Sequence, residues 1–420
     1  MSSSFATFLR TLMALAIASF AAAQDDARDK VTRNDGKVLT GRVLVPDATD
    51  ELILLQGGKR VRIPRADVRE MSLVRDAVRE FCERRVRQRG STKAQEFLID
   101  DAVARGLPGL AKVQATWLAL TEDDEKAHTF LGHRKGPKGW LWEHEGRALT
   151  REQLDVALGK QPMTLVGERF SLRCDADLAL NTAALLDLEH LGVAWFARYG
   201  EALQLREVLE PMLVTTYRTP DVFPKWGFRP MPYYVPPPHE DVGKTFYAGS
   251  APQRPQKMFF VGTQALLYHT LIGDADRRDA RDRVCAWLEI GLGMNMEFTM
   301  QGDAGYAVPG PLRAQDLLAM QALGTGYRLN QITHLPMYGG FYLMDDAPTA
   351  TNWTASTMFV AWLLDDENPF KTRDAFLRYV REALAEKKGD SSSLFDKAMG
   401  RRIEDFDEPW RAWLAKKKAG

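Results

Sequence analysis

The sequence has little cysteine, little histidine and no excess of charge of either sign. Three cysteines in 420 residues are too few for a disulfide framework. Lys and Arg together number 56, as do Asp and Glu, so the formal net charge is zero. A zero balance argues against a nucleic-acid binder, which carries a basic excess, and against a disordered charged tail. The 45% of hydrophobic residues is enough to build a folded core.

Long apolar runs are missing except for a short one at the N-terminus. Thr11–Phe20 is apolar, follows Arg10, and is followed by the small residues Ala21-Ala22-Ala23. This pattern is typical of a secretory signal peptide, and the run is too short to span a bilayer. We therefore predict a signal peptide over residues 1–23, with an uncleaved anchor as the alternative. The mature protein would then be exported, periplasmic or extracellular, with no transmembrane segment after cleavage.

The mature chain divides into three predicted segments. Residues 29–73 contain strand-like runs at Lys37–Val45, Glu51–Gln56 and Lys59–Ile63, separated by turns such as Gly57-Gly58. Several short strands with tight turns favour a small SH3- or Sm-like β-barrel. Residues 74–160 carry apolar residues at three- and four-residue spacing and are predicted to form a helical connector.

The third segment, residues 161–420, is predicted to be a mostly helical domain with a small sheet, giving an α+β fold. Strands are expected at Arg169–Cys174 and Met212–Tyr217, and a long helix at Leu178–Tyr199. Residues 229–256 hold seven of the 21 prolines and are predicted to form a long surface loop. Further helices are expected at Val261–Ile272, Asp279–Met296, Asn352–Leu364, Thr372–Lys388, Ser391–Met399 and Pro409–Lys417.

The sequence lacks the common motifs of catalysis. It has no glycine-rich phosphate loop and no G-x-S-x-G elbow. The seven histidines are scattered, and we interpret the neighbours His128 and His133 as solvated. His144-Glu145 and His239-Glu240 lack the second histidine four residues on that a zinc helix needs. The cysteines, at most one pair of which could form a disulfide, have no metal-ligand spacing and are interpreted as buried or incidental thiols.

Roughly residues 165–415 resemble gluzincin-type, peptidase MA-like domains of secreted bacterial proteins. The resemblance depends on the order of several segments rather than on one motif. These segments are Leu188-Glu189-His190, Thr215–Pro220, Phe246-Tyr247, Trp287–Gly293, Asn352–Ser356 and Ser393–Gly400. It implies a zincin-like fold for this part of the chain.

In such peptidases one helix carries His-Glu-x-x-His and a second carries Trp-Leu-x-Glu-Gly, whose glutamate is the third zinc ligand. Here His269 matches the second histidine, while Ala265 replaces the first and Leu266 replaces the general base. Ile290 stands at the third ligand, next to Glu289. Zinc catalysis needs about three protein ligands and a proton acceptor. The resemblance therefore implies a degenerate site with no metal and no cofactor.

We predict an exported, non-catalytic peptidase-like protein that acts as a binding or scaffolding module for a polypeptide or envelope component. The candidate residues of its binding cleft are His269, Glu289, Glu297, Tyr233, Tyr234 and His239. One alternative is an active hydrolase or metallopeptidase that uses zinc or other chemistry around His269, with Glu289 or Glu297, or with His239 and Glu240. Another is a purely structural envelope protein, because a fold does not determine a function.

Overall fold

A computed structural model describes most of the chain from Asp29 to Lys417. The described residues are 29–175, 177–224, 231–237, 239–248, 254–272, 285–301, 317–318, 320–321, 327–333, 346–385 and 391–417. The predicted signal peptide, residues 1–23, lies outside them. Within the described ranges, no helix combines the length and the apolar character needed to cross a membrane.

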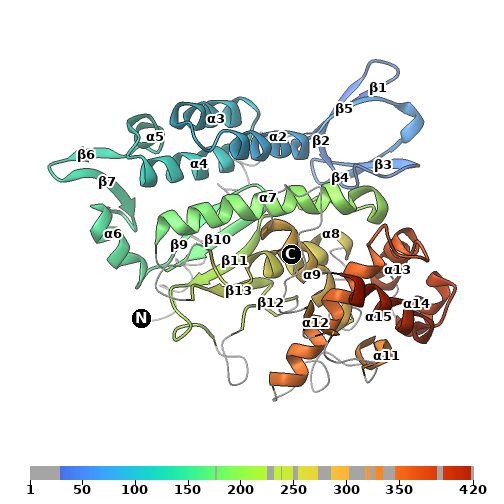
Figure 1. The fold of residues 1–420 in the computed structure, drawn as a ribbon. Helices are drawn as coiled ribbons and strands as arrows, with labels where there is room; N and C mark the ends of the chain where they lie inside the picture. Colours follow the sequence, from blue (N-terminus) through green and yellow to red (C-terminus); the bar gives the residue numbers. More distant parts are fainter. Residues whose placement is uncertain are drawn as a thin grey trace, which may run out of the picture.

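The N-terminal module is a five-stranded antiparallel sheet in the order β4-β3-β2-β1-β5 (Figure 1). Its three predicted strands are confirmed, and two further strands complete the sheet. Buried Val31, Val43, Leu52 and Leu54 give it a small core of its own. The strands are β1 (Asp29–Arg33), β2 (Val38–Val43), β3 (Glu51–Gln56), β4 (Lys59–Pro64) and β5 (Val68–Ser72), with the short helix η2 (Arg65–Asp67) between the last two.

The closed barrel expected from the sequence is not what the described strands form, because β4 and β5 lie at opposite edges of the sheet. Lys59, Arg60 and Arg62 are exposed on β4. Charged side chains on an outer strand are typical of an open edge, where they discourage further strand pairing.

The connector is helical, as predicted, but it also contains a three-stranded sheet, β6-β7-β8. Helix α6 begins with a capping box: the Thr150 side chain accepts from the Gln153 N–H, and the Gln153 side chain accepts from the Thr150 N–H. The elements are α2 (Val74–Arg87), α3 (Thr92–Ala104), α4 (Pro108–Thr121), α5 (Glu125–Phe130), β6 (Arg134–Gly136), β7 (Gly139–His144), β8 (Arg147–Leu149) and α6 (Arg151–Leu158).

The main sheet has the order β12-β13-β11-β10-β9, with β10, β11 and β13 parallel and both outer strands antiparallel to their neighbours. Two of its strands lie inside the segment predicted as a loop, so that prediction was wrong there. Val242–Phe246 contains Gly and Lys and has weak strand propensity, but pairing on both sides stabilises it. The strands are β9 (Met163–Val166), β10 (Phe170–Cys174), β11 (Met212–Tyr217), β12 (Tyr233–Val235) and β13 (Val242–Phe246).

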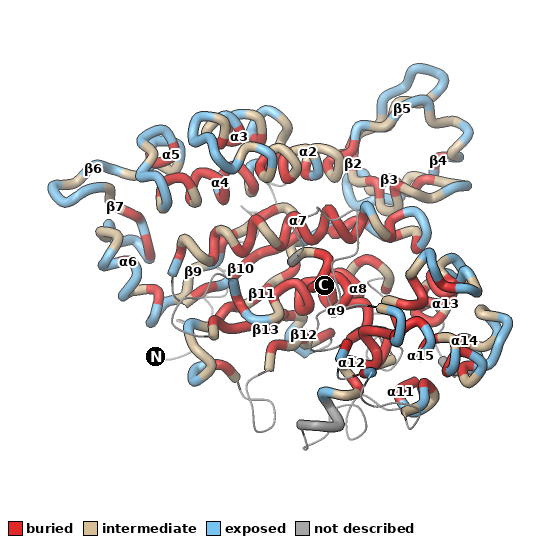
Figure 2. The backbone as a smooth tube through the Cα atoms, viewed as in Figure 1, coloured by how far each residue is buried: buried red, intermediate tan, exposed pale blue. Residues whose placement is uncertain are grey.

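Helix α7 lies between the connector helices and the main sheet, and its buried residues face both (Figures 1 and 2). The C-terminal helices pack around α9, where Trp287 is buried among the rings of Phe359, Tyr379 and Phe395. Of the described residues, 53% are helical and 20% are in strands, which agrees with a mixed fold that is mostly helical. The helices are α7 (Leu178–Leu203), α8 (Met258–Leu271), α9 (Ala286–Gln301), α11 (Leu329–Thr333), α12 (Asp346–Leu363), α13 (Arg373–Ala385), α14 (Ser391–Met399), η5 (Ile403–Phe406) and α15 (Asp407–Lys416).

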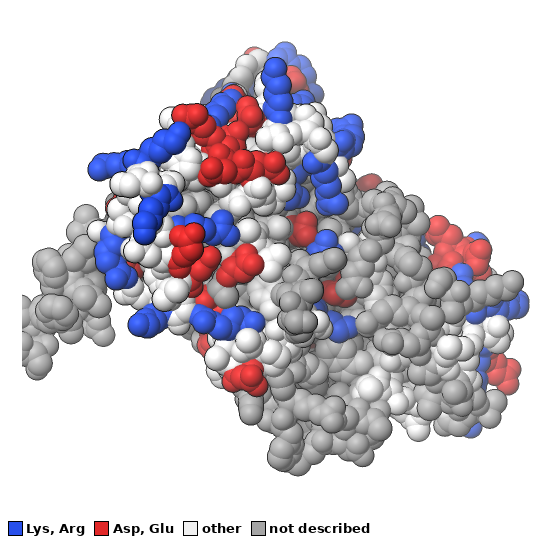
Figure 3. Space-filling model, turned by 60° about the vertical axis from the view of Figure 1, so that its left-hand side comes forward, with Lys and Arg blue, Asp and Glu red and all other residues white. Residues whose placement is uncertain are grey.

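The N-terminal sheet is tied to the rest of the chain by polar contacts. The Glu207 N–H donates to the Leu44 carbonyl oxygen at 2.7 Å, and Arg75 donates both terminal guanidinium nitrogens to the Asp47 carboxylate at 2.6 and 2.8 Å. Bidentate pairs of this kind fix orientation as well as position. On the face shown in Figure 3, described Lys and Arg side chains are interspersed with Asp and Glu, in keeping with the zero net charge.

Candidate functional site

The four degenerate-site positions predicted from the sequence lie on two adjacent helices, α8 and α9. Ala265, Leu266 and Ile290 are fully buried, with 0% of their surface exposed. His269, at the C-terminal end of α8, instead lines a cavity to which none of these three residues contributes. The structure therefore does not bring the four predicted positions together around one pocket.

The polar contact between α8 and α9 is made one residue earlier than the sequence comparison predicts. Gln264 Nε2 donates to Glu289 Oε1 in a short hydrogen bond, and Tyr268 OH donates to Glu289 Oε2 at 3.3 Å. Gln264 and Tyr268 are four residues apart and so share one helix face. All three side chains are buried. The carboxylate that faces α8 is thus Glu289, and its partners are an amide and a phenol.

Glu289 and Glu297 were predicted to line a cleft, and the structure contradicts this. Both are 4% exposed and lie in the α8–α9 interface. Glu297 Oε2 accepts from the Phe260 backbone N–H at 2.8 Å, in the first turn of α8, where N–H groups lack a partner within the helix. Glu297 therefore caps α8, an N-terminal position where a negative charge is favourable.

His269 belongs to a different polar group that includes Tyr234, another predicted cleft residue. His269 Nε2 is 2.9 Å from Asp241 Oδ1, and the Tyr234 hydroxyl donates to the same oxygen in a short hydrogen bond. The sequence analysis missed Asp241, which lies in a tight turn before β13 with a φ of 53°. An acidic residue directly after His239-Glu240 was the only signal that could have indicated it.

The two remaining cleft candidates are not part of this group. His239 is exposed, and its backbone N–H donates to the Pro236 carbonyl oxygen at 3.3 Å. Tyr233 contacts Lys244, whose ammonium group lies 5.7 Å from the centre of the tyrosine ring. Burial raises the pKa of Tyr233 to about 12, so its phenol stays protonated at neutral pH.

His269 and Asp241 lie on the wall of a cavity of about 490 Å³ between the N-terminal sheet and the main domain. The N-terminal sheet contributes Leu44, Leu55 and Arg60 to this cavity. The opposite wall is the segment that leads from α7 into β11, ending at Leu213. The cavity therefore combines apolar and charged groups from two parts of the chain.

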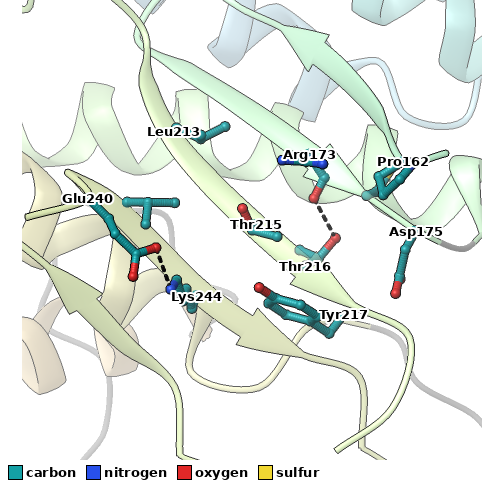
Figure 4. Close-up of a pocket in the computed structure, with 11 residues that line it drawn as sticks. Pro162, Arg173, Asp175, Leu213, Thr215, Thr216, Tyr217, Glu240 and Lys244 are labelled. Carbon is teal, nitrogen blue, oxygen red and sulfur yellow. Dashed lines mark hydrogen bonds and ion pairs between the residues drawn. The ribbon is translucent and has the colours of Figure 1, made fainter. Parts of the chain in front are cut away.

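A second cavity, of about 450 Å³, lies over the outer face of the main sheet (Figure 4). The strand register places Arg173 of β10 beside Thr215 of β11, and Thr215 beside Lys244 of β13. Lys244 Nζ forms an ion pair with Glu240 at 2.5 Å. Leu213, near the start of β11, lines this cavity as well as the first.

The described residues include no cluster of three or more His, Cys, Asp or Glu side chains arranged to hold a metal ion. None of the three cysteines is in a disulfide, and burial raises the pKa of Cys82 and of Cys174 to about 12. Such thiols are poor nucleophiles because the thiolate is scarce. No family model matches the chain, and a search of curated proteins finds no match either.

The interpretation of His128 as solvated was wrong, and His133 is half-buried beside it. His128 is buried, its Nδ1 is 2.8 Å from Nδ1 of His133, and its Nε2 is 3.1 Å from Asp123 Oδ1. The His128 ring stacks on Trp140, and the His133 ring lies 4.1 Å from that of Trp142. The two tryptophans of β7 cover the pair, and this contact between β7 and α5 could not be seen in the local sequence.

This histidine pair should make the connector sensitive to acid. Burial lowers the pKa of His133 to about 4, with a further contribution from His128. A base whose pKa falls on folding stabilises the folded state above its unfolded pKa of about 6.5, and this stabilisation is lost as pH falls toward 4. We expect His133→Phe to reduce the loss of stability between pH 7 and pH 4.5 by about 1–2 kcal/mol. Urea unfolding followed by tryptophan fluorescence measures this, with His239→Phe as the exposed control.

An unchanged pH dependence in His133→Phe would show that the pair does not titrate in this range. Equal changes in both variants would point to a general effect of removing a histidine.

Proposed function

We propose that this chain is an exported, non-catalytic peptidase-like protein that binds a segment of polypeptide. The observation that carries the proposal is a pair of cavities that share Leu213 as a lining residue. We propose that the two cavities act as one groove, lined by the N-terminal sheet and His269 in the first cavity and by Arg173 and Tyr217 in the second. Its walls mix apolar side chains with a few charged and hydroxyl groups, as ligand sites in proteins commonly do.

The residues at the degenerate positions support binding without peptide cleavage. Alanine, leucine and isoleucine can neither ligate a metal ion nor accept a proton, and Ala265, Leu266 and Ile290 are enclosed in the core. Of the two carboxylates that contact α8, Glu289 is engaged by Gln264 and Tyr268, and Glu297 accepts from the Phe260 N–H. A polypeptide ligand follows from the resemblance to peptidases, whose clefts accept extended chains.

The finer fold and the location of the protein belong to the same proposal. The N-terminal strand order, with a short 3-10 helix between β4 and β5, supports a strongly bent, SH3-like sheet. The parallel core of the main sheet, with α7 and α8 packed against it, supports a zincin-like domain. Export depends on the apolar run Thr11–Phe20 and the small residues after it.

A hydrolase centred on His269 is the second candidate, and one contact favours it. The Asp241 carboxylate lies 2.9 Å from His269 Nε2, and a carboxylate that orients an imidazole is a common general-base arrangement. Among the described residues that line this cavity, none is a serine, cysteine or threonine. Such an enzyme would therefore have to activate water rather than form a covalent intermediate.

The two candidates are separated by measuring binding and cleavage with the same probe. We expect fluorescein-labelled casein to bind the untagged protein without being cut. Leu213→Arg should weaken this binding at least tenfold, because the longer, charged side chain replaces one that lines both cavities. Val156→Arg, at an exposed position on α6, is the matched control and should bind like the wild type.

Two outcomes would contradict the proposal. Binding by Leu213→Arg as tight as that of the wild type would place the ligand elsewhere. Cleavage of casein that disappears in His269→Ala would establish the hydrolase instead, and metal analysis of the same untagged preparation would show whether zinc takes part.

A further inference from the structure

We infer that the part of the groove over β10, β11 and β13 recognises a carboxylate group, so that the bound polypeptide is an acidic segment. This inference rests on the proposed function and names the chemistry of its ligand. It depends on three side chains that the strand register places in one row across the sheet: Arg173, Thr215 and Lys244.

The row lies on the outer face of the sheet. Along β11 the residues alternate, with Met212, Val214 and Thr216 buried and Leu213, Thr215 and Tyr217 partly exposed. Neighbouring strands are about 4.8 Å apart, so the backbones that carry the two cations are about 10 Å apart with the threonine hydroxyl between them. All three residues line the same cavity (Figure 4).

Two charged side chains that line this cavity, Asp175 and Glu240, have an oppositely charged partner, and Arg173 has none among the described residues. Asp175 lies 3.7 Å from Arg218, and Glu240 pairs with Lys244 at 2.5 Å. Arg173 makes no ion pair with any described residue, although it is exposed beside this row. A guanidinium group binds a carboxylate through two parallel hydrogen bonds, and the neighbouring hydroxyl can donate a third. A single unpaired cation suits a singly charged carboxylate better than a doubly charged phosphate.

Glu240 already shows how a carboxylate occupies this place. Its side chain is 56% exposed, whereas that of Lys244 is only 10% exposed. The ammonium group is thus largely removed from water, and this strengthens its attraction for an anion. It also lies 5.7 Å from the centre of the Tyr233 ring. A ligand carboxylate would compete with the more exposed Glu240 for this cation. Leu213 and Val242 at one end of the cavity offer contacts to apolar side chains beside the acidic ones.

The test compares two ten-residue peptides, acetylated and amidated at their ends, that differ only in carrying two glutamates or two glutamines. By calorimetry, we expect the glutamate peptide to bind at least tenfold more tightly. Arg173→Met should remove this preference, and Glu240→Gln should strengthen binding of the glutamate peptide several-fold. Arg134→Met, which removes an exposed arginine of β6, should change neither affinity.

The other possible results separate the carboxylate site from the proposed function. Equal affinities for the two peptides, or a preference that survives in Arg173→Met, would overturn the carboxylate site while leaving polypeptide binding intact. Failure of both peptides to bind, together with binding of free glutarate that is lost in Arg173→Met, would support the carboxylate site and overturn the proposed function. Failure of all three probes would overturn both.

Discussion

Replacing Glu189 with alanine is expected to lower the free energy of unfolding by about 3–5 kcal/mol. Glu189, on α7, is fully buried, and its Oε1 accepts hydrogen bonds from three successive backbone N–H groups, those of Glu168, Arg169 and Phe170, at 2.7, 2.8 and 3.0 Å. Alanine would leave these donors buried without an acceptor. It would also leave the Arg169 guanidinium without this nearby negative charge.

The pKa of Glu189 shows the balance of effects at this position. Burial raises the pKa of its carboxyl group, while Arg169 and the three N–H groups lower it. The carboxylate therefore depends on these partners, and they depend on it to hold the turn before β10. That turn sets the position of Arg173 three residues further on, so the loss of Glu189 should disturb the groove as well as the core.

The effect of Glu189→Ala is measured as the midpoint of urea unfolding, followed by circular dichroism and tryptophan fluorescence. Glu189→Gln keeps an acceptor of the same length and should cost about 1–2 kcal/mol. Glu201→Ala, at an exposed position near the end of the same helix, should change stability by less than about 0.5 kcal/mol. A loss below 1 kcal/mol in Glu189→Ala would mean that backbone movement or water replaces the carboxylate.

Local sequence signals predicted many helices and strands of this fold well. β11 covers Met212–Tyr217 and α14 covers Ser391–Met399, the same residues that the sequence indicated. The capping box at Thr150 is likewise local, since both of its hydrogen bonds join residues three apart. Such features depend on the spacing of a few neighbouring residues and not on the rest of the chain.

Features that depend on distant parts of the chain were missed. β13 is a strand because β11 and β12 flank it, and Asp241 meets His269 across 28 residues. His128 is buried because β7 folds back over α5 and brings Trp140 and Trp142 against the histidine pair. The row Arg173-Thr215-Lys244 needs the register of three strands, which no single segment specifies.

The alignment of α8 with the zinc-binding helix of metallopeptidases can be tested by building a zinc site into α8. The double variant Gln264→His with Tyr268→His is expected to bind zinc at least a thousandfold more tightly than the wild type. Two histidines four residues apart on a helix face one metal ion, and Glu289 already contacts both positions. Two imidazoles and one carboxylate then supply the three protein ligands of a typical catalytic zinc site, and the smaller histidine at position 268 leaves room for the ion.

A second double variant tests the alignment predicted from the sequence, in which positions 265, 269 and 290 correspond to the three zinc ligands. Ala265→His with Ile290→Glu recreates the ligand set around His269. It should bind zinc no better than the wild type, because His269 faces Asp241 rather than α9. Metal analysis after gel filtration and competition with a chelator measure both variants, with circular dichroism to show that each is folded. Zinc binding by the second variant and not by the first would support the alignment predicted from the sequence and place the degenerate site beside the groove.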